Sequence, residues 1–157
     1  MLARLMFAIV DFTARKGLAE AAGEDSPQQA RQRARRTGAR GETYAYWYLR
    51  RHGYVLVGRN YRAPGLKGEI DLIGYDGPVL AFVEVKTRAA GEAQQRPEDA
   101  VNAEKRQHLV RMARQFAGSR RVDPASCRFD VLAIETRPGM RPAVRLHKGA
   151  FSPQAAC

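Results

Sequence analysis

The sequence predicts an α/β protein in which one central mixed β-sheet is flanked by helices. Two segments have the apolar spacing of helices, and five shorter segments are apolar and rich in β-branched or aromatic residues, as strands are. Their order along the chain is α-β-β-β-α-β-β. Because three strands follow one another before the second helix, the pattern favours a hairpin-rich mixed sheet over a doubly wound one. The length of 157 residues suits one domain with a single core.

The first helix and the strands are delimited by residues that favour helix ends and turns. Tyr44 and Tyr48 recur at helical spacing, and Gly53 is a natural end for that helix. Asp76 and Gly77 form a strong hairpin signal between the second and third strands. We therefore expect a helix over residues 41–53 and strands over residues 54–62, 69–75, 79–87, 127–135 and 143–147.

The second helix is the longer one and is predicted from Pro97 to Gly118. Proline is favoured in the first turn of a helix, and glycine is favoured just beyond its end. Between them, Val101, Leu109 and Met112 mark an apolar stripe at helical spacing. We therefore expect an amphipathic helix of about six turns here.

The charge balance points to a polyanionic partner. The chain has 27 lysines and arginines against 16 aspartates and glutamates, which gives a net charge of +11 and a sequence pI of about 10.4. Such a chain is attracted to nucleic acid or to an acidic membrane face. A basic surface with no partner is the alternative.

Composition also divides the chain into three parts. Residues 1–35 combine arginine, glutamine, proline and serine with little to bury, so we expect a mobile basic extension there. Residues 36–150 hold the predicted helices and strands and form the expected folded domain, and residues 151–157 form a short tail.

The two cysteines and the hydropathy pattern indicate a cytoplasmic location. Cys127 and Cys157 form neither a Cys-x-x-Cys pair nor a disulfide framework, which fits a reducing compartment. No apolar run approaches the roughly 20 residues of a transmembrane helix, so no membrane insertion is expected.

The chemistry is predicted to lie between the second and third strands. Alternate side chains of a strand share a face, so Glu84 and Lys86 share a face of an otherwise apolar strand. If residues 76–77 turn the chain, Asp71 of the preceding strand comes to lie near them. Two carboxylates beside an amine suit a Mg²⁺ site, because magnesium takes oxygen ligands and keeps several waters. Glu69 is either a further ligand or a charge at the strand edge.

The alternative for this group of residues is an ion pair on a sheet surface. A Glu-x-Lys pattern in a strand is a short motif with many false positives. Its setting favours a site here: the strand is hydrophobic, an aspartate lies on the facing hairpin arm, and the chain is strongly basic.

These residues carry a family resemblance. Asp71, followed thirteen residues later by Glu84, Val85 and Lys86, looks like the PD-(D/E)xK nuclease signature of the restriction-endonuclease-like superfamily. Over residues 36–146 the chain resembles the YraN-like family of uncharacterised bacterial proteins, which is similar to archaeal-type Holliday-junction resolvases. The segments that carry the resemblance are GETYAYWYLRRHGY, RNYR, GEIDLI, VLAFVEVKTR, PEDAVNAEKRQHL and RFDVLAIE.

The resemblance implies a restriction-endonuclease-like fold and a set of site residues. Asp71 and Glu84 would be metal ligands, Lys86 would be a catalytic lysine, and Glu42 on the first helix would join the metal site. The implied cofactor is Mg²⁺ or Mn²⁺. The implied activity is a metal-dependent endonuclease that hydrolyses DNA phosphodiester bonds, with branched or junction DNA as the substrate and a homodimer to cut two strands.

Several basic residues are candidates for contacts with the phosphate backbone, which position a nucleic acid without reading its sequence. They are Arg36, Arg40, Arg59, Arg62, Lys67, Arg88 and Lys105. The alternative function is a non-catalytic nucleic-acid-binding module that retains the nuclease fold. A basic protein associated with membrane surfaces or ribosomes is a third interpretation.

Overall fold

The structure is a computed structural model that describes residues 1–18, 26–90 and 101–152. Its strands form one five-stranded sheet in the order β1-β2-β3-β4-β5. Strands β3 and β4 pair in parallel, and the other neighbouring strands pair antiparallel. The elements are α1 (Leu2–Arg15), α2 (Pro27–Arg51), β1 (Val55–Tyr61), β2 (Ile70–Asp76), β3 (Val79–Ala89), α3 (Ala103–Ser119), a short 3-10 turn (Pro124–Ser126), β4 (Cys127–Thr136) and β5 (Ala143–Phe151).

This architecture confirms the predicted mixed sheet flanked by helices and is compatible with a restriction-endonuclease-like fold. The predicted hairpin is also confirmed, because Asp76 pairs with Val79 across the turn and Gly77 has a positive φ of 59°. Among the described elements, the first helix, α1, and the short 3-10 turn are additional to the expected order.

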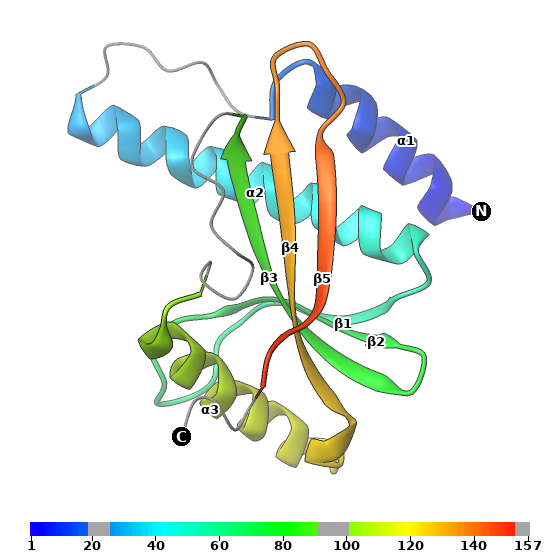
Figure 1. Cartoon of the computed structure of the whole chain (residues 1–157), viewed down its shortest axis with the longest axis vertical. Coiled ribbons are helices and arrows are strands. Elements are labelled where there is room, and N and C mark those ends of the chain that lie inside the picture. The colour runs from blue at the N-terminus through cyan, green and yellow to red at the C-terminus, as the bar shows by residue number, and fades with distance from the viewer. Residues whose placement is uncertain (19–25, 91–100, 153–157) are drawn as a thin grey trace.

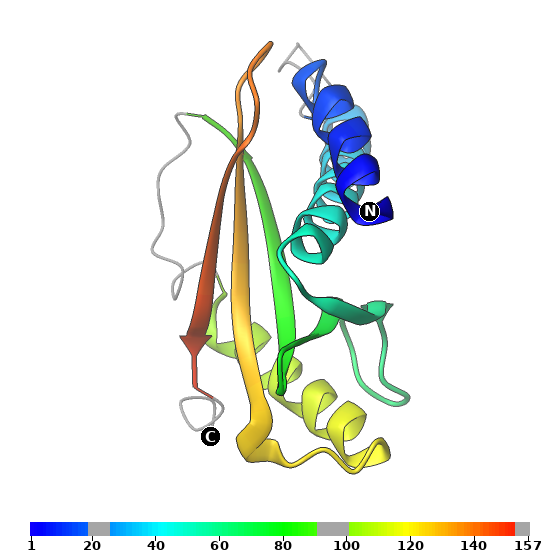
Figure 2. The same cartoon turned by 90° about the vertical axis from the view of Figure 1, so that its right-hand side faces the viewer.

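Each face of the sheet covers a separate part of the core. On β3, Leu80 and Phe82 point to the cluster that includes α3, whereas Ala81 and Val83 point to the cluster that includes α1 and α2. This alternation is the period of two expected of a strand that is buried on both faces. In Figures 1 and 2, α1 and α2 lie against the upper part of the sheet, and α3 lies against its lower part.

Helix α2 begins earlier than predicted. Ser26 accepts a hydrogen bond from the backbone N–H of Gln29, and the Gln29 side chain accepts one from the backbone N–H of Ser26. This reciprocal capping box, followed by Pro27, starts the helix well before residue 41. The arginine-rich stretch before residue 41 is therefore helical. It can remain exposed because the buried residues of α2, which pack on the core, lie at or after residue 41.

Residues 2–15 also differ from the extension that we expected, because they form α1 and pack on α2. Phe7 is 2% exposed, and its ring meets the Tyr44 ring edge-on with 5.4 Å between centroids. Asp11 accepts hydrogen bonds from Tyr44 at 2.8 Å and from Arg141 at 2.9 Å. These contacts join α1 to α2 and to the loop that connects β4 and β5.

The boundaries of α3 and β5 differ from the predicted ones. Helix α3 begins after Asn102, whose side chain accepts a hydrogen bond from the N–H of Lys105 at 2.8 Å. The predicted start at Pro97 lies outside the described residues. Strand β5 extends to Phe151, which is buried. Residue 151, the first residue of the expected tail, therefore belongs to the sheet. Residues 153–157 lie outside the described part of the chain.

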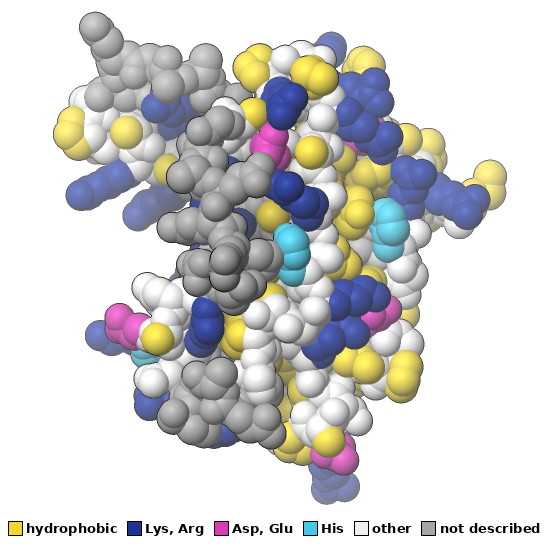
Figure 3. Space-filling model, in the orientation of Figure 1, with side chains coloured by type: hydrophobic (Ala, Val, Ile, Leu, Met, Phe, Trp, Pro, Cys, Tyr) yellow, Lys and Arg dark blue, Asp and Glu magenta, His cyan; other side chains and the backbone are white. Residues whose placement is uncertain are grey.

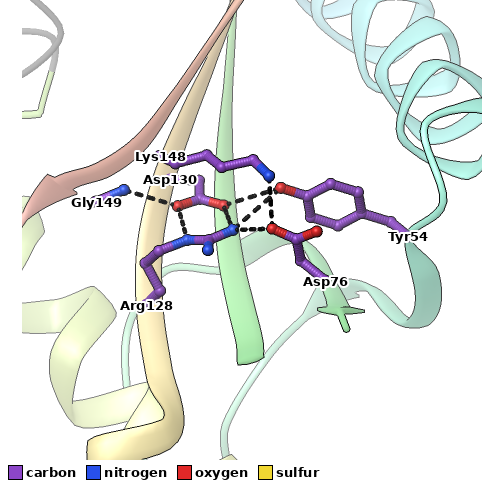
Figure 4. Close-up of polar contacts among 6 residues, drawn as sticks. All are labelled: Tyr54, Asp76, Arg128, Asp130, Lys148 and Gly149. Atoms are coloured by element: carbon purple, nitrogen blue, oxygen red, sulfur yellow. Dashed lines mark hydrogen bonds and ion pairs between the residues drawn. The ribbon is translucent and has the colours of Figure 1, made fainter. Parts of the chain in front are cut away.

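A polar network around the buried Asp130 ties the lower part of the sheet together (Figure 4). Arg128 donates to Asp130 and to Asp76 at 2.7 Å each, and Lys148 donates to Asp76 at 2.7 Å. Tyr54 joins through its hydroxyl, which accepts from Arg128 at 3.1 Å. Asp130 pairs in register with Val83, so it faces the α2 side of the sheet, opposite to Glu84. We assign it a structural role.

Candidate active site

Asp71 and Glu84 lie beside each other on the paired strands β2 and β3. Leu72 is opposite Val83 in the register, so the next positions along the two strands are Asp71 and Glu84. The Asp71 carboxylate accepts a hydrogen bond from the backbone N–H of Val85 at 2.7 Å. Both acids are buried, with 8% and 4% of their surface exposed. The predicted convergence of the two carboxylates is therefore present.

The electrostatic environment of Asp71 opposes its ionisation. Burial, followed by the negative charge of Glu84, raises the pKa of Asp71 to about 7. The Val85 N–H and the Lys105 ammonium act in the opposite direction, and Glu42 adds a further upward contribution. Two neighbouring buried carboxylates repel each other when both are ionised, and a nearby positive charge reduces this repulsion.

Two lysines contact one oxygen of Glu84. The Lys86 Nζ lies 2.9 Å from Glu84 Oε1, and Lys105 of α3 forms an ion pair with the same oxygen. Burial lowers the pKa of Lys105, but the contact with Glu84 outweighs it and raises the pKa. The Lys105 ammonium is therefore charged at neutral pH. Lys86 and Lys105 both remain partly exposed, with 28% and 41% of their side-chain surface accessible.

The second oxygen of Glu84 shows whether the residues present could hold a metal ion. Glu84 Oε2 is buried and has no hydrogen-bond partner among the described residues. A buried carboxylate oxygen without a partner is costly unless a cation or a water binds it. Together with Asp71, it offers a hard divalent cation two carboxylate ligands, and such ions complete their coordination with water. The residues present therefore fit Mg²⁺ or Mn²⁺.

Glu42 approaches this site from α2. Its carboxylate accepts a hydrogen bond from Asn60 of β1 at 2.7 Å, and its charge reaches Asp71. Within the described ranges, however, no three His, Cys, Asp or Glu residues form a group that could hold a metal ion. The metal role of Glu42 stays a prediction.

Helix α2 comes unusually close to β3 next to Glu42. A Cβ built on Gly41 would lie 1.9 Å from Oγ1 of Thr87, so glycine is required for this approach. Asn60, which holds Glu42, has a positive φ of 48°, a conformation that asparagine tolerates better than most residues. Sequence reasoning missed both features, although a Gly-Glu pair and an asparagine in a strand were visible signals.

The predicted phosphate-contacting residues occupy several places rather than one. Lys67 and Lys105 line a common hollow of about 340 Å³ between the loop before β2 and helix α3. Arg62 is paired with Glu69 at 3.0 Å, which supports the strand-edge interpretation of that acid. The others are Arg36, exposed on α2; Arg40, which donates to the Gly17 carbonyl; Arg59, which donates to Thr43; and Arg88, half-buried on β3.

Basic side chains are spread over the molecule. On the face shown in Figure 3, lysines and arginines predominate over acids, and some of them lie on the projecting N-terminal part of α2. No described helix is both long and apolar enough to cross a membrane.

Comparisons with known proteins place these residues in a wider group. The sequence model of the uncharacterised protein family UPF0102 matches residues 41–134. A UPF0102 protein of Koribacter versatilis is 41% identical over 117 residues, which cover 74% of this chain and 79% of the relative. One of Symbiobacterium thermophilum is 43% identical over 118 residues, which cover 75% and 98%. One of Solibacter usitatus is 43% identical over 114 residues, which cover 73% and 84%.

Proposed function

Because the chain belongs to the uncharacterised protein family UPF0102, whose matched residues include the candidate site, we propose from that site that the protein is a metal-dependent endonuclease acting on DNA. The resemblance to PD-(D/E)xK nucleases supports this reaction. The net charge of +11 supports a polyanionic substrate.

The observation that carries the proposal is the buried pair Asp71 and Glu84 with two lysines at one side. Glu84 Oε2 has no partner among the described residues, while Oε1 is held by Lys86 and Lys105. In a buried carboxylate that only forms an ion pair, the second oxygen normally also has a hydrogen-bond partner. This arrangement suits a site that is completed by a bound cation.

Each residue then has a distinct part in phosphodiester hydrolysis. Asp71 and Glu84 would hold a Mg²⁺ or Mn²⁺ ion, which when bound polarises a phosphate and lowers the pKa of a coordinated water. Lys86 would place its positive charge where negative charge develops on the reacting phosphate. Lys105 would hold the Glu84 carboxylate in position, and with Lys67 it would attract the substrate backbone into the adjoining hollow.

Branched or junction DNA is the proposed substrate, on the basis of the family resemblance. Cutting two strands of a junction needs two sites, so the proposal includes a homodimer with two-fold symmetry.

A second candidate is a non-catalytic nucleic-acid-binding module. It is favoured by the two lysines on Glu84, because they already neutralise the buried charge without a metal ion. In this case Asp71, Glu84, Lys86 and Lys105 would stabilise the fold, and the basic surface would provide the function.

A cleavage assay separates the two candidates. Linear, flapped and four-way DNA would be incubated with the wild type in Mg²⁺, in Mn²⁺ or in EDTA, together with Glu84→Gln and the control Glu135→Gln. Glu135 is an acid of β4 that pairs with Arg137 and Arg145, apart from the site. The endonuclease proposal expects metal-dependent cleavage that is lost in Glu84→Gln and kept in Glu135→Gln. Binding without cleavage of any substrate by the wild type would favour the scaffold.

A further inference from the structure

A row of side chains on α2 leads away from the candidate site. Glu42, Tyr46 and Arg50 are spaced by four residues, so they lie on one face of the helix. At 1.5 Å per residue the row extends for roughly 12 Å. It starts at the residue whose charge reaches Asp71 and ends on exposed surface.

Aromatic rings and guanidinium groups contact one another beside this row. The Tyr46 and Trp47 rings meet edge-on with 5.1 Å between centroids. The Arg50 guanidinium lies 5.3 Å from the Trp47 ring and 5.7 Å from the Tyr46 ring. From β1, Arg59 lies 6.0 Å from Tyr46 and donates a hydrogen bond to Thr43 at 2.7 Å, next to Glu42.

The two arginines are not neutralised by acids. Among the described residues, the contacts of Arg50 and Arg59 are to tyrosine, tryptophan and threonine side chains, and no carboxylate pairs with either. By contrast, Arg62 and Arg128 are each paired with acids. Two exposed cations that are held over aromatic rings keep their charge available for phosphates.

The rings themselves are half-buried, with one side packed on the core beneath α2. Packing on one side fixes the rings, so a base that stacks on the exposed part loses little side-chain entropy from the protein. Aromatic side chains next to arginines on a basic surface are the pattern by which proteins hold unpaired bases together with their backbone.

We propose that Tyr46, Trp47, Arg50 and Arg59 form a stacking surface for unpaired nucleobases next to the active site. This inference rests on the proposed function and narrows its substrate to nucleic acid that has a single-stranded segment beside the cleaved bond. Fully paired DNA presents no free base faces to this surface and would be bound through its phosphates alone.

Trp47 is the only tryptophan of the chain, so its fluorescence reports on this surface directly. The wild-type protein would be titrated with an oligothymidylate and with a blunt duplex of equal length, in EDTA to prevent cleavage. The proposal expects the single strand to quench Trp47 much more than the duplex does at equal saturation. Equal quenching by both, or none by the single strand, would overturn it.

Variants then measure the contribution to affinity. Trp47→Leu should weaken single-strand binding at least about fivefold, as expected for the loss of one stacked base, and should change duplex binding little. Tyr48→Leu is the matched control, because Tyr48 is the next aromatic residue of α2 but stacks on His52 and contacts Phe7 instead. Melting temperatures of both variants would show that they are folded.

The binding experiments and the cleavage assay test the stacking surface and the nuclease activity separately. If the wild type cuts DNA but Trp47→Leu binds single strands as the wild type does, the stacking surface is excluded and the nuclease proposal stands. If no substrate is cut but the single strand still quenches Trp47 selectively, the stacking surface stands for a binding module.

Discussion

At the scale of single residues, Lys86 and Lys105 share one oxygen of Glu84 but come from different elements. Lys86 belongs to the same strand as Glu84, whereas Lys105 is brought by α3. The removal of either lysine leaves the other on the carboxylate. A structural and a catalytic role for Lys86 therefore have different consequences.

We predict that Lys86→Ala keeps the fold and loses cleavage. Since Lys105 still pairs with Glu84, the melting temperature should change little, while the rate should fall on the order of a hundred- to a thousandfold. The double variant Lys86→Ala/Lys105→Ala leaves a buried charge unpaired and should cost about 3–5 kcal/mol of stability. Thermal unfolding and single-turnover cleavage check both. A Lys86→Ala protein that unfolds readily but cuts normally per folded molecule would make Lys86 structural.

Asp71 gives a prediction about pH. In the folded protein its pKa is raised to about 7 by burial and by Glu84, whereas in the unfolded chain it is near 4. Between these pH values the folded state binds more protons, so the free energy of unfolding should fall as pH rises from about 4 to about 7. In Asp71→Asn this decrease should be smaller by more than about 1 kcal/mol, since one pKa unit corresponds to about 1.4 kcal/mol. Urea unfolding in EDTA at several pH values measures it, and parallel curves for the two proteins would contradict the raised pKa.

At the scale of elements, the position of Glu42 depends on how closely α2 approaches β3. Gly41 allows this approach because it has no Cβ, and Thr87 Oγ1 at the contact is buried without a described hydrogen-bond partner. A methyl group added at residue 41 would therefore force α2 and β3 apart or displace the Thr87 side chain.

Gly41→Ala should destabilise the protein by about 1–3 kcal/mol, as overpacking does, and should reduce activity by moving Glu42. Thr87→Ala removes the oxygen that the new methyl group would meet. It should be nearly neutral alone and should recover much of the stability in the double variant. Chemical denaturation of the four proteins gives the coupling energy, and strictly additive effects would mean that the two residues do not limit the approach.

The N-terminal half of α2 is the element that we expect to contribute most to the proposed binding of phosphates. It projects from the body of the molecule and carries several arginines (Figures 1 and 3). Its helical form fixes their spacing, which a mobile extension would not.

Replacement of Arg31, Arg35 and Arg36 by glutamine should weaken DNA binding without a change in sequence preference. Each lost phosphate contact lowers the salt slope of the affinity by about 1, so the triple variant should lower it by up to about 3. A triple replacement of Arg111, Arg137 and Arg145 removes the same charge elsewhere and should have a smaller effect. Fluorescence anisotropy at several salt concentrations measures the slopes, and equal changes in both variants would show that net charge matters rather than α2.

At the scale of the whole molecule, the sheet and the proximity of Asp71 and Glu84 were predictable from local patterns. Alternation along residues 79–87 and the turn at Asp76 and Gly77 gave the hairpin, and the hairpin brought Asp71 next to Glu84. These features depend on neighbours close in sequence and on a fixed period of two.

The features that were missed depend on contacts between distant segments. Phe7 reaches Tyr44 across 37 positions, and Lys105 reaches Glu84 across 21, and neither pairing has a periodic signal. The early start of α2 was different, because Ser26 and Gln29 form a capping box that was visible in the sequence. We nevertheless expected a mobile extension, because residues 1–35 contain few apolar side chains that could be buried.

The proposed function depends above all on whether Asp71 and Glu84 form a binding site for a divalent cation. Direct binding of Mn²⁺ to the folded protein, measured by calorimetry for the wild type, Asp71→Asn, Glu84→Gln and the control Glu135→Gln, tests it without any need for a substrate. We expect saturable binding by the wild type and by Glu135→Gln that is lost or greatly weakened in Asp71→Asn and Glu84→Gln. Absence of binding to the wild type, or equal binding by all four proteins, would contradict it.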